Sequence, residues 1–409
     1  MRIAAPSELR LASVGGMVSP SDENKRVAVV CDFLEERWPS MDLVGDMLFE
    51  QLSRHHSKEF ATIQVRPAMR RRFSRLPIGQ SKSAHTGDRL LNRMFDYPRT
   101  LRRIASQFDV VHIVDHSYAH LALEFAPERT IVTCHDLNTF RCLLEPDKEP
   151  RSRWFNAIAR RILNGMNNCA RVICVSSTVR DEILRYRLLP DDRLRVVHNG
   201  FHPSCSHLPD LATDSIAAHL LGEDLEQRDI YLLHVGSTVA RKRIDRLLHI
   251  FSHVRKRLPS AHLVRVGGPF TPEQEALAQR LGVLGAIHVM PFLEREILSA
   301  IYRRAAVVLQ PSDAEGFGLP IVEALACGRA VIASDLPVFR EVGASAVVYC
   351  PLDDIAAWSD AVIEQVEKPR SSPNAFEESR LLALNRAAQF SWTAAIEKIA
   401  AVYREVVND

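Results

Sequence analysis

The sequence predicts an α/β protein of two doubly wound domains with a cleft between them. Apolar, β-branched runs typical of buried parallel strands alternate with amphipathic helical segments in both halves of the chain. At 409 residues, the chain is too long for one ordinary hydrophobic core. The composition, with 46% hydrophobic residues, 25% charged residues and a net charge of +2, is that of a soluble globular protein.

Breaks in this alternation predict the domain boundaries. The N-terminal stretch has no continuous apolar core, so no signal peptide is expected and residues 1–25 are predicted to be a mostly disordered tail. The first domain is expected over residues 26–205 and the second over residues 206–389. A connection with weak periodicity is expected over residues 203–228. Residues 390–409 are predicted to contain an amphipathic helix.

The cysteines and the apolar runs indicate the cellular compartment of the protein. Eight cysteines are scattered without a Cys-x-x-Cys pair, which predicts neither a disulfide framework nor a zinc site. No apolar run approaches the length of a membrane span. A reduced, cytoplasmic protein is therefore expected.

Positive charge is concentrated in the N-terminal half. Up to residue 205 the chain has 31 Lys and Arg against 24 Asp and Glu, and the remainder has 21 against 26. Residues 66–103 alone have 11 against 2. This asymmetry predicts that a face of the first domain meets an anionic partner.

The sequence of residues 66–76 predicts one contact with an anionic partner. Pro67 can begin a short helix in which Met69, Phe73 and Leu76 lie on one side, with most of the neighbouring arginines elsewhere. A basic amphipathic helix of this kind lies in a membrane interface. The alternative is a solvated helix that packs its apolar residues on its own domain.

Residues 306–334 are the stretch around which the chain is organised. An apolar strand over residues 306–310 leads through Gly316 and Gly318 to Pro320, which suits the start of a helix because its missing N–H costs nothing there. Two glycines ahead of a helix let the backbone approach an anion at the positive end of the helix dipole. The segment predicts an anion-binding loop.

Two carboxylates, Glu315 and Glu323, bracket this loop. A phosphate alone gains nothing from two negative charges. A ligand with phosphates in the middle and hydroxyl groups on both sides does, because carboxylates accept hydroxyl hydrogen bonds. A nucleoside diphosphate sugar has this layout. The alternative is an ordinary strand–loop–helix crossover with incidental acids.

The run from Glu315 to Glu323 resembles the E-x7-E signature of the retaining family-four glycosyltransferases, which have the GT-B architecture. The resemblance covers most of residues 26–409. It implies two Rossmann-like domains and a C-terminal helix that crosses back to the first domain. It also implies that Glu315 holds the sugar hydroxyls and Glu323 the ribose. The loop residues implied in substrate binding are Gly316, Phe317, Gly318 and Leu319.

A second motif follows the strand over residues 231–235. Gly236, Arg241 and Lys242 resemble the family's Gly-x-x-x-x-Arg-Lys motif, whose cations hold the donor diphosphate. Fixed cations stabilise a leaving diphosphate as its negative charge grows. The glycine that usually follows is replaced by Arg243. The alternative is a solvated charge pair at the start of a helix.

Other positions match the family less completely. The strand over residues 130–134 ends in His135 and Asp136, which resemble the family's His-Asp motif, and the resemblance places His135 near the donor sugar. The same resemblance places Phe292 and Leu293 beside the nucleobase. The Gly-Gly pair of the first loop is missing, since this chain has only Gly45 there, inside a predicted helix.

The expected function is transfer of a sugar from a nucleoside diphosphate sugar to an acceptor hydroxyl with retention of configuration, in polysaccharide or glycolipid assembly. Catalysis is assigned to Arg241, Lys242, Glu315 and His135. No metal and no cofactor are expected, because no Asp-x-Asp follows a strand. The acceptor is expected to be lipid-linked or anionic, and no nucleic acid is involved. The alternatives are an epimerase or phosphorylase of the same architecture and a non-catalytic scaffold.

Overall fold

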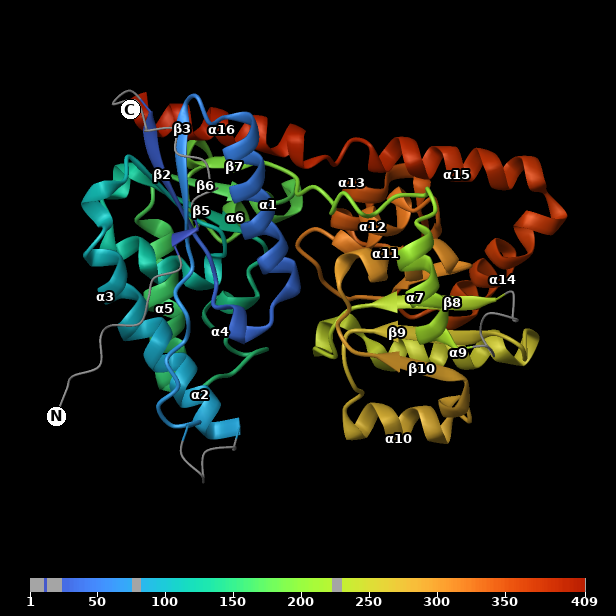
Figure 1. The fold of residues 1–409 in the computed structure, drawn as a ribbon. Helices are drawn as coiled ribbons and strands as arrows, with labels where there is room; N and C mark the ends of the chain where they lie inside the picture. The colour runs from blue at the N-terminus through green and yellow to red at the C-terminus, as the bar shows by residue number, and fades with distance from the viewer. Residues whose placement is uncertain (1–10, 13–23, 76–81, 223–229, 409) are drawn as a thin grey trace. The chain divides into compact units, whose positions relative to one another are not determined.

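The protein is described by a computed structural model that covers residues 11–12, 24–75, 82–222 and 230–408 (Figure 1). It divides into an N-terminal unit of residues 1–198 and 392–409 and a C-terminal unit of residues 199–391. The first unit therefore ends seven residues before the expected boundary at residue 205, and the last helix begins at Trp392. Each unit has its own sheet.

The N-terminal unit contains a seven-stranded sheet of order β1-β3-β2-β4-β5-β6-β7. All neighbouring strands are parallel except β1, which pairs antiparallel with β3 at one edge. Every residue of the central strands β4 and β5 is buried, as expected for apolar strands covered on both faces. The strands are β1 (Leu11–Ala12), β2 (Lys25–Val30), β3 (Phe60–Val65), β4 (Val110–Ile113), β5 (Thr130–Cys134), β6 (Arg171–Cys174) and β7 (Leu194–Val196).

The last helix of the chain belongs to this N-terminal unit. The last helix, α16, packs on α1 and is tied to the sheet by polar contacts. The hydroxyl of Tyr403 lies 2.7 Å from Nδ1 of His112, and the carboxylate of Glu405 binds Arg171 and Arg195. The return of the C-terminal helix to the first domain is thus confirmed. The helices are α1 (Pro39–His55), α2 (Lys82–Leu91), α3 (Tyr97–Arg102), α4 (Arg141–Leu144), α5 (Arg153–Asn167), α6 (Ser177–Arg185) and α16 (Trp392–Asn408).

The prediction of an amphipathic helix over residues 66–76 is wrong. Residues 66–75 have no helical structure, and Leu76 lies outside the described residues. The carboxylate of Asp88, on α2, accepts the backbone N–H groups of Arg72 and Phe73 at 2.9 Å and that of Ser74 at 3.0 Å. These donors are therefore satisfied from outside the segment, and a local helix would have to break these bonds.

Two further predictions concern the N-terminal part of the chain. The predicted disordered tail contains β1, which pairs with Val65 and Gln64 of β3, whereas residues 1–10 and 13–23 lie outside the described part. Gly45 lies inside α1, as predicted. A Cβ there would lie 2.7 Å from Sγ of Cys31, so this glycine permits close packing of α1 on the sheet.

The C-terminal unit contains a six-stranded, fully parallel sheet of order β10-β9-β8-β11-β12-β13. The two parallel sheets with flanking helices confirm the predicted doubly wound architecture. The strands are β8 (Tyr231–Val235), β9 (His262–Val266), β10 (Ile287–Met290), β11 (Val307–Gln310), β12 (Ala330–Ser334) and β13 (Val348–Cys350).

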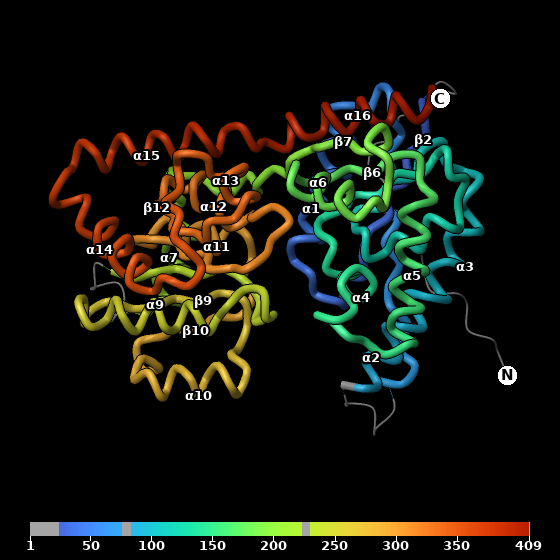
Figure 2. The backbone as a smooth tube through the Cα atoms, turned by 180° about the vertical axis from the view of Figure 1, so that it is seen from behind, coloured from blue at the N-terminus to red at the C-terminus, as the bar shows by residue number. Residues whose placement is uncertain are grey.

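Helices α9 and α14 lie side by side over the sheet of this unit, as both views show (Figures 1 and 2). Trp358 of α14 and Phe251 of α9 are fully buried in the resulting core. The expected connection over residues 203–228 contains the helix α7, which packs on α11, and its residues 223–228 lie outside the described part. The helices are α7 (Leu211–Leu221), α9 (Ile244–Arg257), α10 (Pro272–Arg280), α11 (Arg295–Arg304), α12 (Leu319–Ala326), α13 (Pro337–Gly343), α14 (Ile355–Ser371) and α15 (Pro373–Ala387).

Candidate active site

The strand order of the C-terminal sheet reverses between β8 and β11. The chain passes from β8 to β9 and β10 on one side, then crosses to β11, β12 and β13 on the other. Open parallel sheets bind ligands beyond the carboxyl ends of their strands at such a point. The loop after β8 contains Gly236, Arg241 and Lys242, and the loop after β11 contains Glu315.

The carboxylate of Glu315 binds both predicted cations. Nη1 of Arg241 lies 2.6 Å from Oε2, and Nζ of Lys242 lies 2.6 Å from Oε1. The hydroxyl of Ser312 donates a third hydrogen bond of 2.8 Å to Oε1. The backbone N–H of Asp313 also donates to the carbonyl of Arg241 at 2.8 Å, so main chain and side chains together join the two loops.

These contacts keep Glu315 ionised. Burial by itself raises the pKa of this carboxyl, but the charges of Lys242 and Arg241 and the bond from Ser312 outweigh it and lower the pKa to about 2. Glu315 therefore stays ionised across the physiological pH range, in contact with both basic side chains. Such a group of fixed charges can bind a diphosphate and accept hydroxyl hydrogen bonds side by side.

Arg243 occupies the position where the family usually has glycine, and the structure shows how an arginine is accommodated there. Its backbone is left-handed, with φ of 48° and ψ of 53°, a conformation that glycine adopts without strain. Its guanidinium binds Asp245 at 2.7 Å and Asp313 at 2.9 Å. These ion pairs hold the strained turn in place, and they tie it to the loop that carries Glu315.

The glycine loop leads into α12 as predicted. Gly318 has a φ of +100°, and a Cβ there would lie 3.0 Å from the ring of Phe339, so both the backbone and the space require glycine. Pro320 lies in the first turn of α12. Phe317 is buried and packs edge-on against Phe390, with ring centroids 5.8 Å apart. The predicted loop residues Gly316 and Leu319 lie in the same short segment.

Glu323 lies in the second turn of α12 and is nearly buried, with 8% of its surface exposed. The hydroxyl of Tyr302, on α11, donates a 2.9 Å hydrogen bond to its Oε2. Burial raises the pKa of Glu323 above its usual value, and the bond from Tyr302 and the charges of Arg295 and Lys242 only partly oppose this. The pKa values of the two signature glutamates are thus shifted in opposite directions, down for Glu315 and up for Glu323.

Phe292 and Leu293 follow β10, the edge strand of this sheet. Phe292 is half exposed, and no hydrogen bond or ion pair among the described residues joins this turn to Glu315. The structure does not bring these two residues into the charged cluster.

His135 belongs to the N-terminal unit, at the carboxyl end of β5. Its Nε2 donates to the carbonyl of Val114 at 2.7 Å, and its backbone N–H donates to Nδ1 of His116 at 3.2 Å. Burial lowers the pKa of His135, although the charge of Asp115 opposes the change. A neutral ring that donates through Nε2 has Nδ1 as its acceptor. His135 can therefore accept a hydrogen bond or a proton at that atom.

Residues outside the predicted motifs also shape these groups. Ser312 and Tyr302 hold the two signature glutamates, and Asp32 and Asp115 follow β2 and β4 beside His135 on the neighbouring strand. The position of Asp32 and Asp115 at the ends of predicted strands was a usable signal. Among the described residues, no group of His, Cys, Asp and Glu has the arrangement of a metal site.

Two family models match the chain. The model of glycosyltransferase family 4 matches residues 50–204, and the model of glycosyl transferases group 1 matches residues 222–380. The chain belongs to the group 1 glycosyltransferases, with the GT-B architecture expected from the sequence.

Curated relatives share part of the chain. Alpha-maltose-1-phosphate synthase of Mycolicibacterium smegmatis is 31% identical over 252 residues, which are 58% of this chain and 63% of the relative. O-antigen chain mannosyltransferase B of Escherichia coli is 27% identical over 268 residues, which are 65% of this chain and 67% of the relative. The matches therefore span only about two thirds of the length of these relatives.

Solved structures match nearly the whole chain. Sucrose-phosphate synthase from Thermosynechococcus elongatus has a TM-score of 0.69 at 17% identity and covers 94% of this chain and 99% of its own. The HepE protein of Anabaena, solved in complex with UDP and glucose, has a TM-score of 0.66 at 15% identity and covers 93% of this chain and 100% of its own. These likenesses confirm the fold.

Proposed function

We propose that this protein transfers a sugar from a nucleoside diphosphate sugar to an acceptor hydroxyl, with retention of anomeric configuration and without a metal ion. The observation that carries the proposal is the contact of Glu315 with both Arg241 and Lys242 at the point where the strand order reverses. This arrangement offers cations for a diphosphate and a carboxylate for sugar hydroxyls within one cluster.

The proposed reaction uses the leaving diphosphate as the base. The bond between the anomeric carbon and the diphosphate oxygen breaks, and Arg241 and Lys242 stabilise the negative charge that this oxygen gains. The acceptor oxygen attacks the oxocarbenium-like sugar from the same face, and its proton passes to the departing phosphate. Glu315 orients the sugar hydroxyls, Glu323 the ribose, and His135 contacts the sugar. The products are the glycosylated acceptor and a nucleoside diphosphate.

The relatives favour transfer onto a glycan or glycolipid. Two of them are named O-antigen chain mannosyltransferases, and a solved structure of similar fold is described as a glycosyltransferase involved in lipopolysaccharide biosynthesis. We propose a related role in polysaccharide or glycolipid assembly in the cytoplasm, with a lipid-linked or anionic acceptor. No helix among the described residues is long and apolar enough to cross a membrane.

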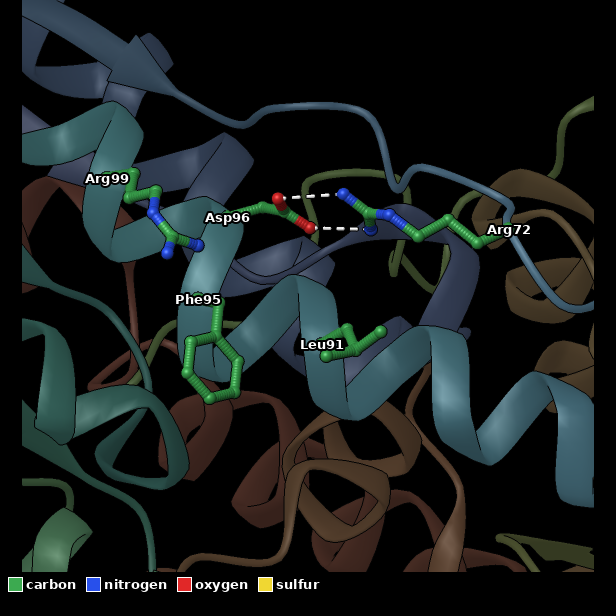
Figure 3. Close-up of a pocket in the computed structure, with 5 residues that line it drawn as sticks. All are labelled: Arg72, Leu91, Phe95, Asp96 and Arg99. Carbon is green, nitrogen blue, oxygen red and sulfur yellow. Dashed lines mark hydrogen bonds and ion pairs between the residues drawn. The ribbon is translucent and has the colours of Figure 1, made fainter.

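A contact with the membrane surface is part of this proposal. The basic segment, residues 66–103, contains a pocket of about 230 Å³ lined by Arg72, Leu91, Phe95, Asp96 and Arg99 (Figure 3). Asp96 binds both terminal nitrogens of Arg72, and the ring of Phe95 is half exposed beside Arg99. Exposed aromatic rings among arginines suit the interface of an anionic bilayer.

The test begins with a panel of UDP-, GDP- and ADP-sugars, scored by thermal stabilisation of the protein. The stabilising donor is then incubated with candidate acceptors, with and without a chelator, and the anomeric configuration of the product is determined by NMR. Retained configuration and unchanged turnover with the chelator are expected. Turnover that depends on inorganic phosphate indicates a phosphorylase, an epimerised donor indicates an epimerase, and binding without turnover of any acceptor indicates a scaffold.

A further inference from the structure

Arg265 is a buried cation without an anionic partner. It lies on β9, its surface is 0% exposed, and no carboxylate among the described residues lies within ion-pair distance of its guanidinium. The guanidinium lies 5.2 Å from the ring centroid of Phe270. Burial lowers the pKa of Arg265 to about 10, so the group is still charged at neutral pH. A buried charge without a counter-charge is costly and calls for a functional explanation.

Arg265 joins the loops that follow two adjacent strands. Its Nη2 donates to the carbonyl of Gly236 at 3.0 Å, and its Nη1 donates to the carbonyl of Gly268. Gly267 has a φ of +137°, and a Cβ there would lie 2.0 Å from the carbonyl oxygen of Gly236, so these loops touch through their backbones. The bond from Arg265 holds a carbonyl of the loop that leads to Arg241. If the carbonyl oxygen of Gly236 instead pointed toward a bound phosphate, it would repel that phosphate.

His234 is a second unexplained polar group at the same place. It pairs in register with Arg265, is 0% exposed, and has no hydrogen-bond partner among the described residues at either ring nitrogen. Its Cε1 lies 3.3 Å from the position that a Cβ on Gly236 would take. Burial and the charges of Arg265 and Lys242 lower the pKa of His234, so this ring is neutral. It adds polarity beneath the loop without adding charge.

Basic side chains outnumber acidic ones around the Gly236 loop among the described residues. Arg241, Lys242 and Arg265 are cations, and Glu315 is the carboxylate that contacts two of them. The surplus is positive. The diphosphate of a nucleoside diphosphate sugar carries one negative charge on each phosphate and complements this surplus.

We propose that Arg265 is a positioning residue for the donor diphosphate. Its buried charge attracts the diphosphate, and its hydrogen bond shapes the Gly236 loop that receives it. The inference rests on the proposed function, because it names the ligand of the same site. Arg265 acts through the loop and through its field. Its effect is therefore expected to follow its charge more closely than its hydrogen bonds.

The test compares two substitutions by calorimetry with UDP, GDP or ADP, whichever the wild-type protein binds best. Arg265→Gln keeps donors for the loop carbonyls but removes the charge, whereas Arg265→Lys keeps the charge. We expect Arg265→Gln to weaken diphosphate binding roughly tenfold or more, the scale of a charge acting over several ångströms at intermediate dielectric. Its own melting temperature should equal or exceed that of the wild type. Arg265→Lys should stay within about threefold of wild-type affinity.

The matched control is Arg303→Gln. Arg303 is a buried arginine of the same unit that binds Asp214 at 2.7 Å. Its loss should lower stability and leave diphosphate affinity unchanged, which separates a folding effect from a binding effect. If Arg265→Gln does not fold, Arg265→Lys decides alone, and a tenfold loss of affinity in that variant overturns the inference.

Two other results overturn it. Wild-type affinity in Arg265→Gln shows that the charge is not used, and equal losses in the Gln and Lys variants show that only the shape of the loop matters. If the wild-type protein binds none of the three diphosphates, the proposed function fails and this inference fails with it. Binding by the wild type that both substitutions leave unchanged overturns this inference alone.

Discussion

The ammonium group of Lys242 lies 2.6 Å from a carboxylate oxygen of Glu315, so two residues predicted to hold different parts of one donor contact each other directly. The contact couples their functions. Any anion that approaches Lys242 competes with Glu315 for it, and a change in either residue alters the charge that the other presents. Substitutions in this pair therefore need to be interpreted together with Arg241, which binds the same carboxylate.

Arg241→Ala and Lys242→Ala are each expected to lower kcat/KM. Both cations lie where the leaving diphosphate is proposed to gain charge, and loss of such a group raises the barrier by about 2–4 kcal/mol. The effect should appear in kcat as well as in KM. Steady-state kinetics with a fixed acceptor measures it. Near-normal kcat/KM in both variants would falsify the assignment.

Glu315→Gln and Glu323→Gln are expected to damage different steps. Glu315→Gln removes a carboxylate bound to both Arg241 and Lys242, so diphosphate binding should hold or tighten while rate and sugar selectivity fall by tenfold or more. Glu323→Gln should mainly weaken nucleotide binding, because this residue is proposed to hold the ribose. Titration with UDP and GDP, together with kcat for several donors, separates the two. Equal, small losses of nucleotide affinity in both variants would contradict this division of roles.

The sequence predicted the two charged loops because each follows an apolar strand and carries a motif within a few residues. Local signals also placed Pro320 in the first turn of α12 and glycine at position 318. Local sequence signals could not predict the contacts of Tyr302 and Arg265. They join residues on different strands and helices, and only the strand order brings these residues together.

Distant contacts also explain the errors. Residues 66–75 have the composition of an amphipathic helix, but the carboxylate of Asp88 captures their backbone donors from another element. The helix α7 has weak periodicity and is held by the ion pair of Asp214 with Arg303, far along the chain. Periodicity within a window detects neither interaction.

The basic segment, residues 66–103, is expected to bind anionic vesicles at low salt. Arg70 and Arg71 are exposed there, and each cation near an anionic surface contributes about 1 kcal/mol, so Arg70→Glu with Arg71→Glu should weaken binding at least tenfold. Sedimentation with anionic and neutral vesicles at two salt concentrations measures this. Lys256→Glu with Arg257→Glu, an equal change of charge on exposed residues of α9, is the control and should have little effect. The idea fails if the wild type does not sediment with anionic vesicles at low salt, or if the first double variant sediments as the wild type does.

Asp32→Asn is expected to stabilise the protein at neutral pH. Asp32 is 2% exposed at the carboxyl end of β2, and neither of its oxygens accepts a hydrogen bond from the residues that the structure describes. Burial raises its pKa well above the usual value. The charge of Asp115, a hydrogen bond that protonated Asp32 donates to Asp115, and the charge of Glu36 raise it further, against the charge of Arg93. The pKa of Asp115 itself is lowered to about 2, because the nearby His116 and His135 and the bonds from Ser117 outweigh the effect of burial, so Asp115 stays ionised beside it.

The sign of the pH effect follows from this shift. Between its usual pKa of about 3.8 and the raised value, Asp32 is protonated in the folded protein and ionised in the unfolded chain, so stability falls as the pH rises through this interval. Asparagine is neutral in both states. Asp32→Asn should therefore raise the free energy of unfolding at pH 7 by on the order of 1 kcal/mol or more, since each pKa unit corresponds to about 1.4 kcal/mol. It should leave stability below pH 4 almost unchanged. Melting temperatures between pH 4 and 8 test this, with Asp181→Asn, an exposed aspartate of the same unit, as the control. A variant less stable than the wild type at pH 7, or parallel pH profiles, would show that Asp32 is ionised in the folded protein.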